Sequence, residues 1–164
     1  MARYQKEHVL RKASSHGQQH LWQKDSIRPY CPPVLISACL LGIPCRWHGR
    51  RPKRRDKLIE RLKKGFVLVP VCPEQLSGMP MPRTGEYLGG TGAQVLDEDL
   101  RIIAPEVGED VTRFHVNGAR YTLEVAQAVG AARAYLKGGS PSCDREGVTG
   151  ELLRRAGIQV IRVP

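Results

Sequence analysis

Three cysteines occupy comparable places in the sequence, each at or after the end of a short apolar run. Cys39 lies at the end of "VLISACL", Cys72 follows "FVLVPV", and Cys143 lies in the loop "GGSPSC" after "ARAYLK". Thiolates are the ligands that soft metal ions and iron–sulfur clusters prefer. None of the three belongs to a CxxC pair, so an ordinary zinc ribbon is disfavoured. The pattern predicts a soft-metal centre whose ligands come from separate loops.

The alternative is that the three thiols only fill space in the core, because free cysteine is among the most buried residue types. Disulfides are disfavoured, since the five cysteines belong to a chain that we expect in the reducing cytoplasm. The shared position of the three thiols beside Pro or Gly favours the metal centre. With three thiolates, a cubane iron–sulfur cluster would keep one open iron that acts as a Lewis acid.

Further polar side chains lie near these cysteines. Cys45 is in the loop "CLLGIPC", and neighbouring cations such as Arg46 are expected to lower its thiol pKa. We predict a catalytic or substrate-contacting role for Cys45; a fourth metal ligand and a bystander are the alternatives. Glu74 in "CPEQ" is a candidate proton donor or acceptor, or else a solvated loop acid. Ser140 is a candidate for holding a substrate group or a water, or else caps its loop.

Three residues of the same loops are weaker candidates. Arg83 in "MPRTGE" would supply the pocket wall, although a surface position is the commoner case for Arg. His48 and Ser142 are close in sequence to the stronger candidates. Cys31 is assigned no role.

The elements that must position these residues alternate between strand and helix patterns. Short apolar runs are typical of strands buried on both faces, and the helices repeat apolar residues at three- and four-residue steps. In the longest predicted helix, Gly118 costs about 1 kcal/mol relative to Ala, which close packing on a sheet would justify. We expect strands at 34–40, 66–71, 132–138 and 158–163, helices at 54–65, 108–131 and 147–157, a loop at 72–83 and a hairpin within 86–104.

This alternation predicts an α/β domain: a Rossmann-like open, mainly parallel sheet of about four strands with flanking helices and a small hairpin. Right-handed crossovers place the carboxyl ends of parallel strands at one edge of the sheet, where ligands of such folds bind. Because neighbouring strands lie about 4.8 Å apart, the three cysteines are expected to converge at that edge.

The positive charge of the chain is concentrated in two segments. The formal net charge is +10; residues 1–33 hold six Lys and Arg against two acids, and residues 46–64 hold ten against two. We divide the chain into a basic N-terminal extension, 1–33, and an α/β domain, 34–164. The basic surface favours contact with RNA, another polyanion or an anionic small molecule; a solvated helix face with a loose tail is the alternative.

The sequence contains no membrane or export signal that we recognise. No apolar run approaches the roughly 20 residues that span a bilayer, and the basic extension has no apolar signal-peptide core. We therefore expect a cytoplasmic protein without membrane contact.

Four segments in order carry a resemblance: "CLLGIPCRWHG", "VPVCPEQLSGMPMPR", "EDVTRFHVNGA" and "LKGGSPSC". The chain resembles the family once described as domain of unknown function five-two-three (DUF523), which includes iron–sulfur thiouracil desulfidases. The resemblance extends from residue 34 to the C-terminus and leaves out the residues before it.

The resemblance implies an enzyme of sulfur metabolism that binds a [4Fe–4S] cluster through Cys39, Cys72 and Cys143. It implies that the open iron takes the sulfur of a thiolated nucleobase or a similar small thiocarbonyl compound, which leaves as sulfide in a non-redox hydrolysis. Residues at the positions of Cys45, Glu74 and Ser140 resemble the active-site set, with acid–base work assigned to Glu74.

The sequence departs from the family pattern in two places. Trp47-His48-Gly49 replaces a Tyr-Asp-Gly that often follows "CR", so imidazole stands in place of an acid. The glycine-rich stretch usual after "SPSC" is shortened to "DRE" before "GVTGELL". We expect these changes to affect the pocket and its substrate more than cluster binding.

Two other functions are compatible with the residues. One is a non-enzymatic nucleic-acid-binding module in which the thiols are structural zinc ligands or core. The other is a sulfur carrier or transferase in which Cys45 bears a persulfide.

Overall fold

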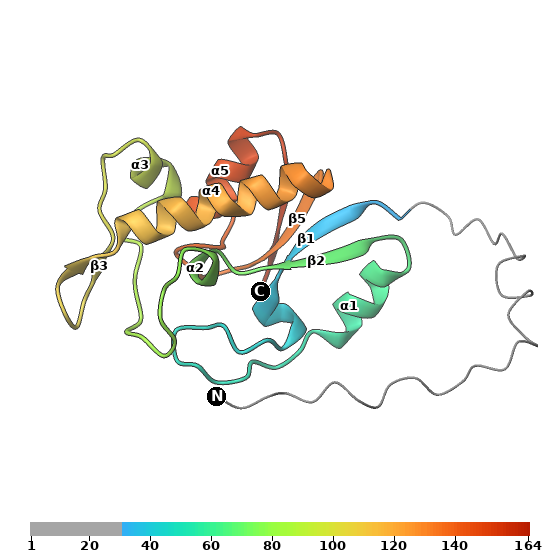
Figure 1. The fold of residues 1–164 in the computed structure, drawn as a ribbon, viewed down its shortest axis with the longest axis horizontal. Coiled ribbons are helices and arrows are strands. Elements are labelled where there is room, and N and C mark those ends of the chain that lie inside the picture. The colour runs from blue at the N-terminus through green and yellow to red at the C-terminus, as the bar shows by residue number, and fades with distance from the viewer. Residues whose placement is uncertain (1–30) are drawn as a thin grey trace, which may run out of the picture. The chain divides into compact units, whose positions relative to one another are not determined.

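The computed structural model describes residues 31–164. Of the predicted extension, 1–33, all but the last three positions therefore lie outside the described residues. The described chain forms a four-stranded sheet with flanking helices and a small antiparallel hairpin (Figure 1). Every pairing in the sheet is parallel, and the predicted fold class is confirmed. In the order β2-β1-β5-β6, its strands are β1 (Pro33–Ser37), β2 (Val67–Val71), β5 (Arg133–Lys137) and β6 (Gln159–Val163).

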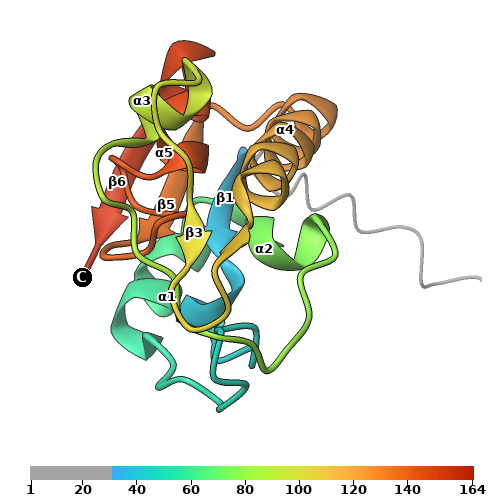
Figure 2. The ribbon, with the colours of Figure 1, turned by 90° about the vertical axis from the view of Figure 1, so that its left-hand side faces the viewer.

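Helices cover both faces of this sheet. They are α1 (Asp56–Lys63), α4 (Thr112–Val129) and α5 (Val148–Arg155). Figure 2 shows α4 and α5 on one face and α1 on the other. Consecutive side chains of β1 point to opposite layers, so Leu35 packs into the core under α4 and α5 while Ile36 packs with Leu62 of α1. Both β1 side chains are fully buried, as expected in the middle of a parallel sheet.

The strand β2 lies at the edge of the sheet, which explains its proline. Pro70 pairs with Ile36 of β1 on one side, and β2 has no further neighbour among the described strands. Only Val71 of β2 is buried, and Val67 is 54% exposed. The predicted strand is therefore confirmed, but its expected burial on both faces is wrong.

The segment between β2 and α4 differs from the prediction. Instead of a loop, Pro73–Leu76 forms the short helix α2, in which proline occupies the first turn. Instead of a hairpin, Gly92–Leu96 forms the helix α3, which begins at a capping box between Thr91 and Gln94. The hairpin lies further along the chain and pairs β3 (Ile103–Ala104) with β4 (Glu109–Asp110).

Gly118 lies at the place where α4 crosses α2. A Cβ atom on Gly118 would overlap the backbone carbonyl of Pro73. Close packing thus explains the glycine, although the packing partner is α2 and not the sheet. Because Pro73 stands between Cys72 and Glu74, α4 helps to fix the position of both.

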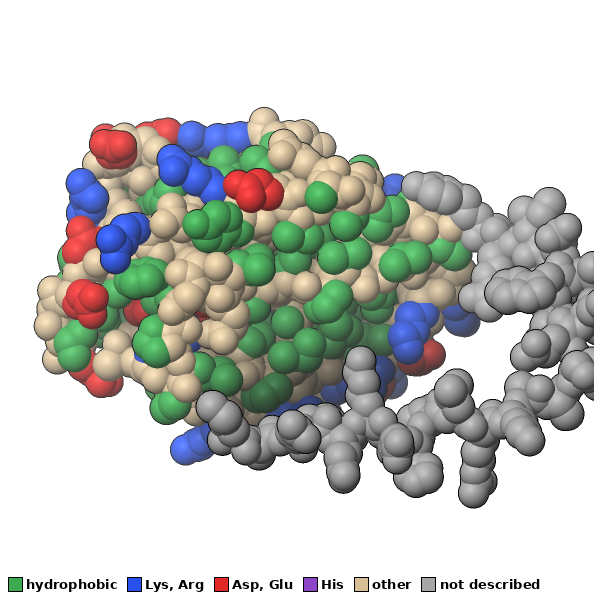
Figure 3. All heavy atoms as spheres, viewed as in Figure 1, with side chains coloured by type: hydrophobic (Ala, Val, Ile, Leu, Met, Phe, Trp, Pro, Cys, Tyr) green, Lys and Arg blue, Asp and Glu red, His purple; other side chains and the backbone are tan. Residues whose placement is uncertain are grey.

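Hydrophobic side chains gather along α4 and β2 on the face shown in Figure 3. Large apolar side chains with appreciable exposure in these two elements are Val67, Tyr121 and Val129. Exposed apolar side chains are ordinary on protein surfaces, and we assign no function to this face. Within residues 31–164, no helix is long and apolar enough to cross a membrane.

Candidate functional site

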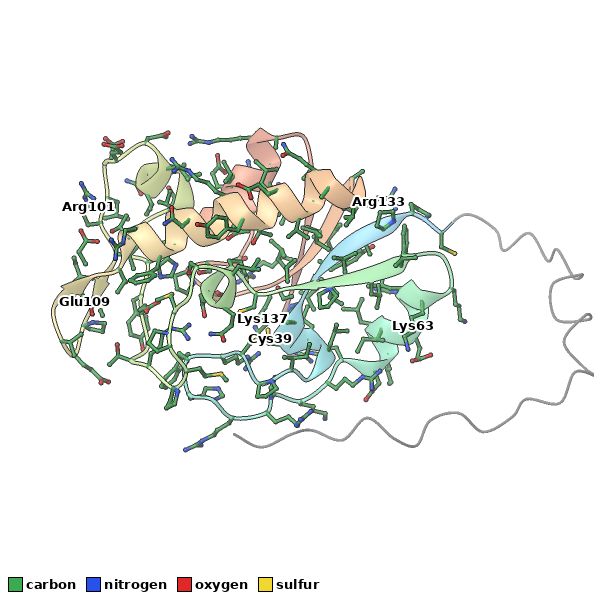
Figure 4. All side chains as sticks on the ribbon, in the orientation of Figure 1. Cys39, Lys63, Arg101, Glu109, Arg133 and Lys137 are labelled. Atoms are coloured by element: carbon green, nitrogen blue, oxygen red, sulfur yellow. The ribbon has the colours of Figure 1, made fainter. Side chains whose placement is uncertain are left out.

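A cavity of about 670 Å³ opens at the edge of the sheet where β1, β2 and β5 end. Cys39, Cys45, Cys72 and Cys143 all line it. Figure 4 shows Cys39 beside Lys137 at this edge, whereas Lys63 and Arg133 lie toward the opposite ends of the strands. The structure therefore brings the three expected ligands together from three separate connections. Their binding of a metal stays a prediction.

The connection after β1 places two of these thiols. Cys39 was expected to end the strand, but β1 stops at Ser37 and a 3-10 helix, η1 (Ala38–Leu41), follows. Gly42 ends η1 with a φ of 83°, and its N–H donates to the Cys39 carbonyl at 3.1 Å. Only glycine adopts this left-handed conformation readily. The resulting turn keeps Cys39 and Cys45 in the same part of the core.

Cys45 forms hydrogen bonds with the thiols of both Cys39 and Cys72. The bond from Cys45 lowers the pKa of Cys39 to about 6; burial opposes this change and Arg46 assists it. Cys45 likewise lowers the pKa of Cys72. The pKa of Cys45 itself is raised, because its contacts with the two neighbouring sulfurs and its burial all favour the protonated thiol. The expectation that nearby cations lower the Cys45 pKa is wrong: the pKa of Cys45 is raised, and the thiol whose pKa falls to about 6 is Cys39.

Cys143 has a different electrostatic environment. Burial raises its pKa, and the negative charges of Glu74, Cys72 and Cys39 raise it further. The Oγ of Ser140 accepts a hydrogen bond from the Cys143 N–H at 3.1 Å. Ser140 therefore caps its loop, which was the alternative interpretation, and it also lines the cavity.

The cysteine thiols line the cavity and do not converge on one point that a single metal ion could occupy. In the part of the chain that the structure describes, no group of three or more Cys, His, Asp or Glu side chains is placed to hold a metal ion. The negative charges at Cys39 and Cys72 raise the pKa of Cys143, so three thiolates at this site would repel one another. A cationic iron–sulfur core, several atoms wide, fits such a donor set because it fills the space and offsets this repulsion.

Glu74 lies in the first turn of α2 and lines the cavity. Its carboxylate forms an ion pair with Arg83, and the two side chains are only 12% and 7% exposed. Glu74 is therefore not a solvated loop acid, and Arg83 is not a surface residue. A charge-assisted contact of this kind fixes the direction of the carboxylate.

Several residues of the cavity wall were not predicted. Lys137 ends β5, and its pKa is lowered by burial and by the charge of Arg46. Glu86 is nearly buried beside Arg83, while Trp47 and Tyr87 are exposed aromatic residues at the wall. The position of Lys137 at the end of a predicted strand could have identified it as a site residue from the sequence. Glu86 and Tyr87 come from an irregular segment that carries no periodic pattern.

Both departures from the family pattern also lie at the cavity. Trp47 and His48 line it, with their rings edge to face at a centroid distance of 5.1 Å. In the shortened connection to α5, Asp144 and Glu146 line it as well. The wall is thus the part of the molecule in which this sequence differs from the expected pattern.

The fold and the cavity define an α/β protein whose candidate site is built by cysteines from three strand-to-helix connections. A family model described as 2-thiouracil desulfurase matches residues 34–163. The chain belongs to the 2-thiouracil desulfurase family, which confirms the resemblance seen in the sequence. Membership of this family indicates an enzyme.

Two relatives show how far the similarity extends. A solved structure of the [4Fe–4S]-dependent thiouracil desulfidase TudS is 32% identical, with a TM-score of 0.68 over 80% of this chain and 90% of that chain. The uncharacterized protein YbbK of Bacillus subtilis (strain 168) is 37% identical over 146 residues, which are 78% of this chain and 93% of YbbK.

Proposed function

We propose that this protein is a [4Fe–4S]-dependent desulfidase that removes sulfur, as sulfide, from a thiolated nucleobase or a similar small thiocarbonyl compound. The observation that carries the proposal is the meeting of Cys39, Cys72 and Cys143 at one cavity in a member of this family. The similarity to a [4Fe–4S]-dependent desulfidase supports the choice of cluster. Cys39, Cys72 and Cys143 would hold the cluster, which would supply a soft, Lewis-acidic iron for the substrate sulfur.

The net reaction exchanges sulfur for oxygen without electron transfer. The C=S bond of the substrate and both O–H bonds of one water molecule break, and a C=O bond forms. Sulfur leaves with the two protons as hydrogen sulfide, which ionises in water. Neither an oxidant nor a reductant is needed.

Glu74 moves the protons in this proposal. Its carboxylate is fixed by Arg83 at the cavity wall, where it takes a proton from the water that attacks the substrate carbon. The same carboxyl group then returns the proton to the departing sulfur. Ser140 positions the substrate or the water, because its Oγ accepts from the Cys143 N–H and its own proton remains free to donate.

Cys45 acts with its proton in place. Because its pKa is raised, it is a hydrogen-bond donor toward sulfur at the cavity and not a nucleophile. This state also counts against the sulfur-carrier alternative, since persulfide formation needs a reactive thiolate.

The proposal is tested by offering 2-thiouracil to the full-length protein after anaerobic reconstitution with iron and sulfide. We expect sulfide and the oxygen-containing base in equal amounts, without added reductant. Brown, iron-loaded protein that releases no sulfide from a panel of thiolated nucleobases would contradict the proposed activity.

Contact with RNA through the basic segments 1–33 and 46–64 stays a prediction. Two arginines of the second segment form hydrogen bonds within the chain. Arg51 donates to the Gly42 carbonyl at 3.2 Å, and Arg55 donates to the Pro164 carbonyl at 2.5 Å. RNA binding that weakens steeply with added salt would favour the nucleic-acid alternative.

A further inference from the structure

A buried chain of polar contacts starts at the cavity carboxylate Glu74. Arg83 pairs with Glu74 and also with Glu86, whose Oε1 lies 3.5 Å from the Arg83 Nε. The other oxygen of Glu86 lies 2.8 Å from the Nε2 of His115 in α4. The Nδ1 of His115 lies 2.8 Å from the Oγ of Ser142. The chain therefore ends at the residue before the proposed cluster ligand Cys143.

One tautomer of His115 satisfies both of its contacts when Glu86 is ionised and the ring is neutral. An ionised Glu86 accepts hydrogen bonds only, so the Nε2 of His115 must carry hydrogen. In the neutral ring the Nδ1 is then an acceptor, and the Ser142 hydroxyl donates to it. His115 and Ser142 are both fully buried, so water does not replace either partner.

The order Glu86–His115–Ser142 resembles a nucleophilic triad, but the hydroxyl is in the wrong place for one. A triad serine must reach the substrate. Ser142 is fully buried, and in the described structure neither Ser142 nor His115 lines the cavity. A buried network of ion pairs and hydrogen bonds of this kind serves to fix the groups at its ends.

We propose that Glu86 and His115 are positioning residues that join the two halves of the site. Through Arg83 they fix the direction of Glu74, and through Ser142 they fix the loop that presents Cys143. The roles of Glu74 in catalysis and of Cys143 in cluster binding rest on the proposed function. The contacts themselves come from the structure alone.

Two substitutions of His115 each remove one of its two contacts and keep the other. In His115→Gln, the side-chain amide nitrogen lies near the position of Nε2 and keeps the contact with Glu86, but the contact with Ser142 is lost. In His115→Asn, the amide oxygen lies near the position of Nδ1 and keeps the contact with Ser142, but the contact with Glu86 is lost. Thr122→Val is the matched control, because Thr122 is fully buried in the same helix and donates to the Gly118 carbonyl at 2.7 Å.

The first measurement uses the full-length protein without cluster. Timed alkylation followed by peptide mass mapping gives the labelling rate of each cysteine. We expect His115→Gln to speed labelling of Cys143 about fivefold, the effect of losing one hydrogen bond, while Cys39 labels as in the parent protein. General destabilisation would instead speed labelling of both thiols, as any unfolding effect of Thr122→Val would.

The second measurement uses the reconstituted protein. We expect His115→Asn to keep its iron and its KM but to lose about tenfold or more in kcat, because Glu74 is no longer held in place. We expect His115→Gln to lose iron faster than the parent protein during a chelator challenge.

Equal labelling of Cys143 in the parent and His115→Gln proteins, together with unchanged kcat in His115→Asn, would overturn the inference. A parent protein that binds no cluster or releases no sulfide would instead contradict the proposed function. In that case the alkylation rates still decide whether His115 holds the Cys143 loop.

Discussion

The residue on which the proposed chemistry depends most is Glu74. Replacing Glu74 with Gln keeps the size of the side chain and a partner for Arg83 but removes the proton acceptor. We expect kcat for sulfide release to fall about 100-fold or more while the iron content stays unchanged. Glu124→Gln, which removes an equal charge from the exposed face of α4, should leave kcat unaltered. Full activity in Glu74→Gln would remove Glu74 from the mechanism.

A second prediction at the scale of residues concerns how Cys45 changes the pKa of Cys39. The Cys39 pKa of about 6 owes its largest lowering to the hydrogen bond from Cys45. In Cys45→Ala this bond is lost, so the pKa of Cys39 should rise toward its ordinary value of 9.0. The measurement is the alkylation rate of Cys39 against pH in cluster-free protein. A midpoint that does not move upward, compared with a Cys31→Ala control, would contradict the assigned thiol and thiolate states.

At the scale of elements, the contact of α4 with α2 is the one most sensitive to change. Alanine normally favours a helix over glycine by about 1 kcal/mol. Gly118→Ala should nevertheless lower the free energy of unfolding by about 1–3 kcal/mol, because its Cβ overlaps the Pro73 backbone. Gly89→Ala, where no atom lies within 4 Å of the added Cβ, is the control for urea unfolding. A Gly118→Ala protein as stable as this control would show that α2 can shift freely.

The sequence predicted the elements whose burial pattern is local and failed where tertiary contacts decide. The apolar runs before Cys39 and Cys143 and the periodicity of α4 identified most of the sheet and its longest helix. The three prolines of the 72–83 segment concealed α2, although proline suits the first turn of a helix. The capping box at Thr91 was a readable signal for α3 that the hairpin prediction overlooked.

The candidate site could likewise be predicted only in part from the sequence. The convergence of Cys39, Cys72 and Cys143 followed from parallel topology, because every strand ends at the same edge. The buried state of Arg83 and the contacts of His115 did not follow from any spacing. They depend on how the irregular 83–90 segment lies against α4, and only the folded structure contains that information.

At the scale of the whole molecule, Asp144 ties the Cys143 loop to the last strand. Its carboxylate accepts hydrogen bonds from the Gly139 N–H at 2.5 Å and the Arg162 Nε at 2.8 Å. Burial raises the pKa of Asp144, but these bonds and the one from the Arg145 N–H outweigh it, and the pKa is lowered overall. The stability that this carboxylate contributes is therefore present above its ordinary pKa of 3.8 and lost as the pH falls through the lowered value.

Asp144→Asn should accordingly lower the free energy of unfolding by about 1 kcal/mol at neutral pH. The difference in unfolding free energy between the two proteins should shrink as the pH falls from 3.8 toward 3, because the unfolded chain then takes up a proton that the folded carboxylate does not yet bind. Urea unfolding curves at the two pH values measure both gaps. A gap of the same size at both values would show that the charge of Asp144 contributes nothing.

We propose that Cys39, Cys72 and Cys143 together hold one [4Fe–4S] cluster. Its most direct measurement is the iron and acid-labile sulfide bound per chain after anaerobic reconstitution of single Cys→Ser variants. We expect about four iron and four sulfide atoms in the parent protein, in Cys31→Ser and in Cys45→Ser, and a severe loss of both when any of the three ligands is replaced. A full cluster in any of those three variants, or an equal loss in Cys31→Ser, would contradict this proposal.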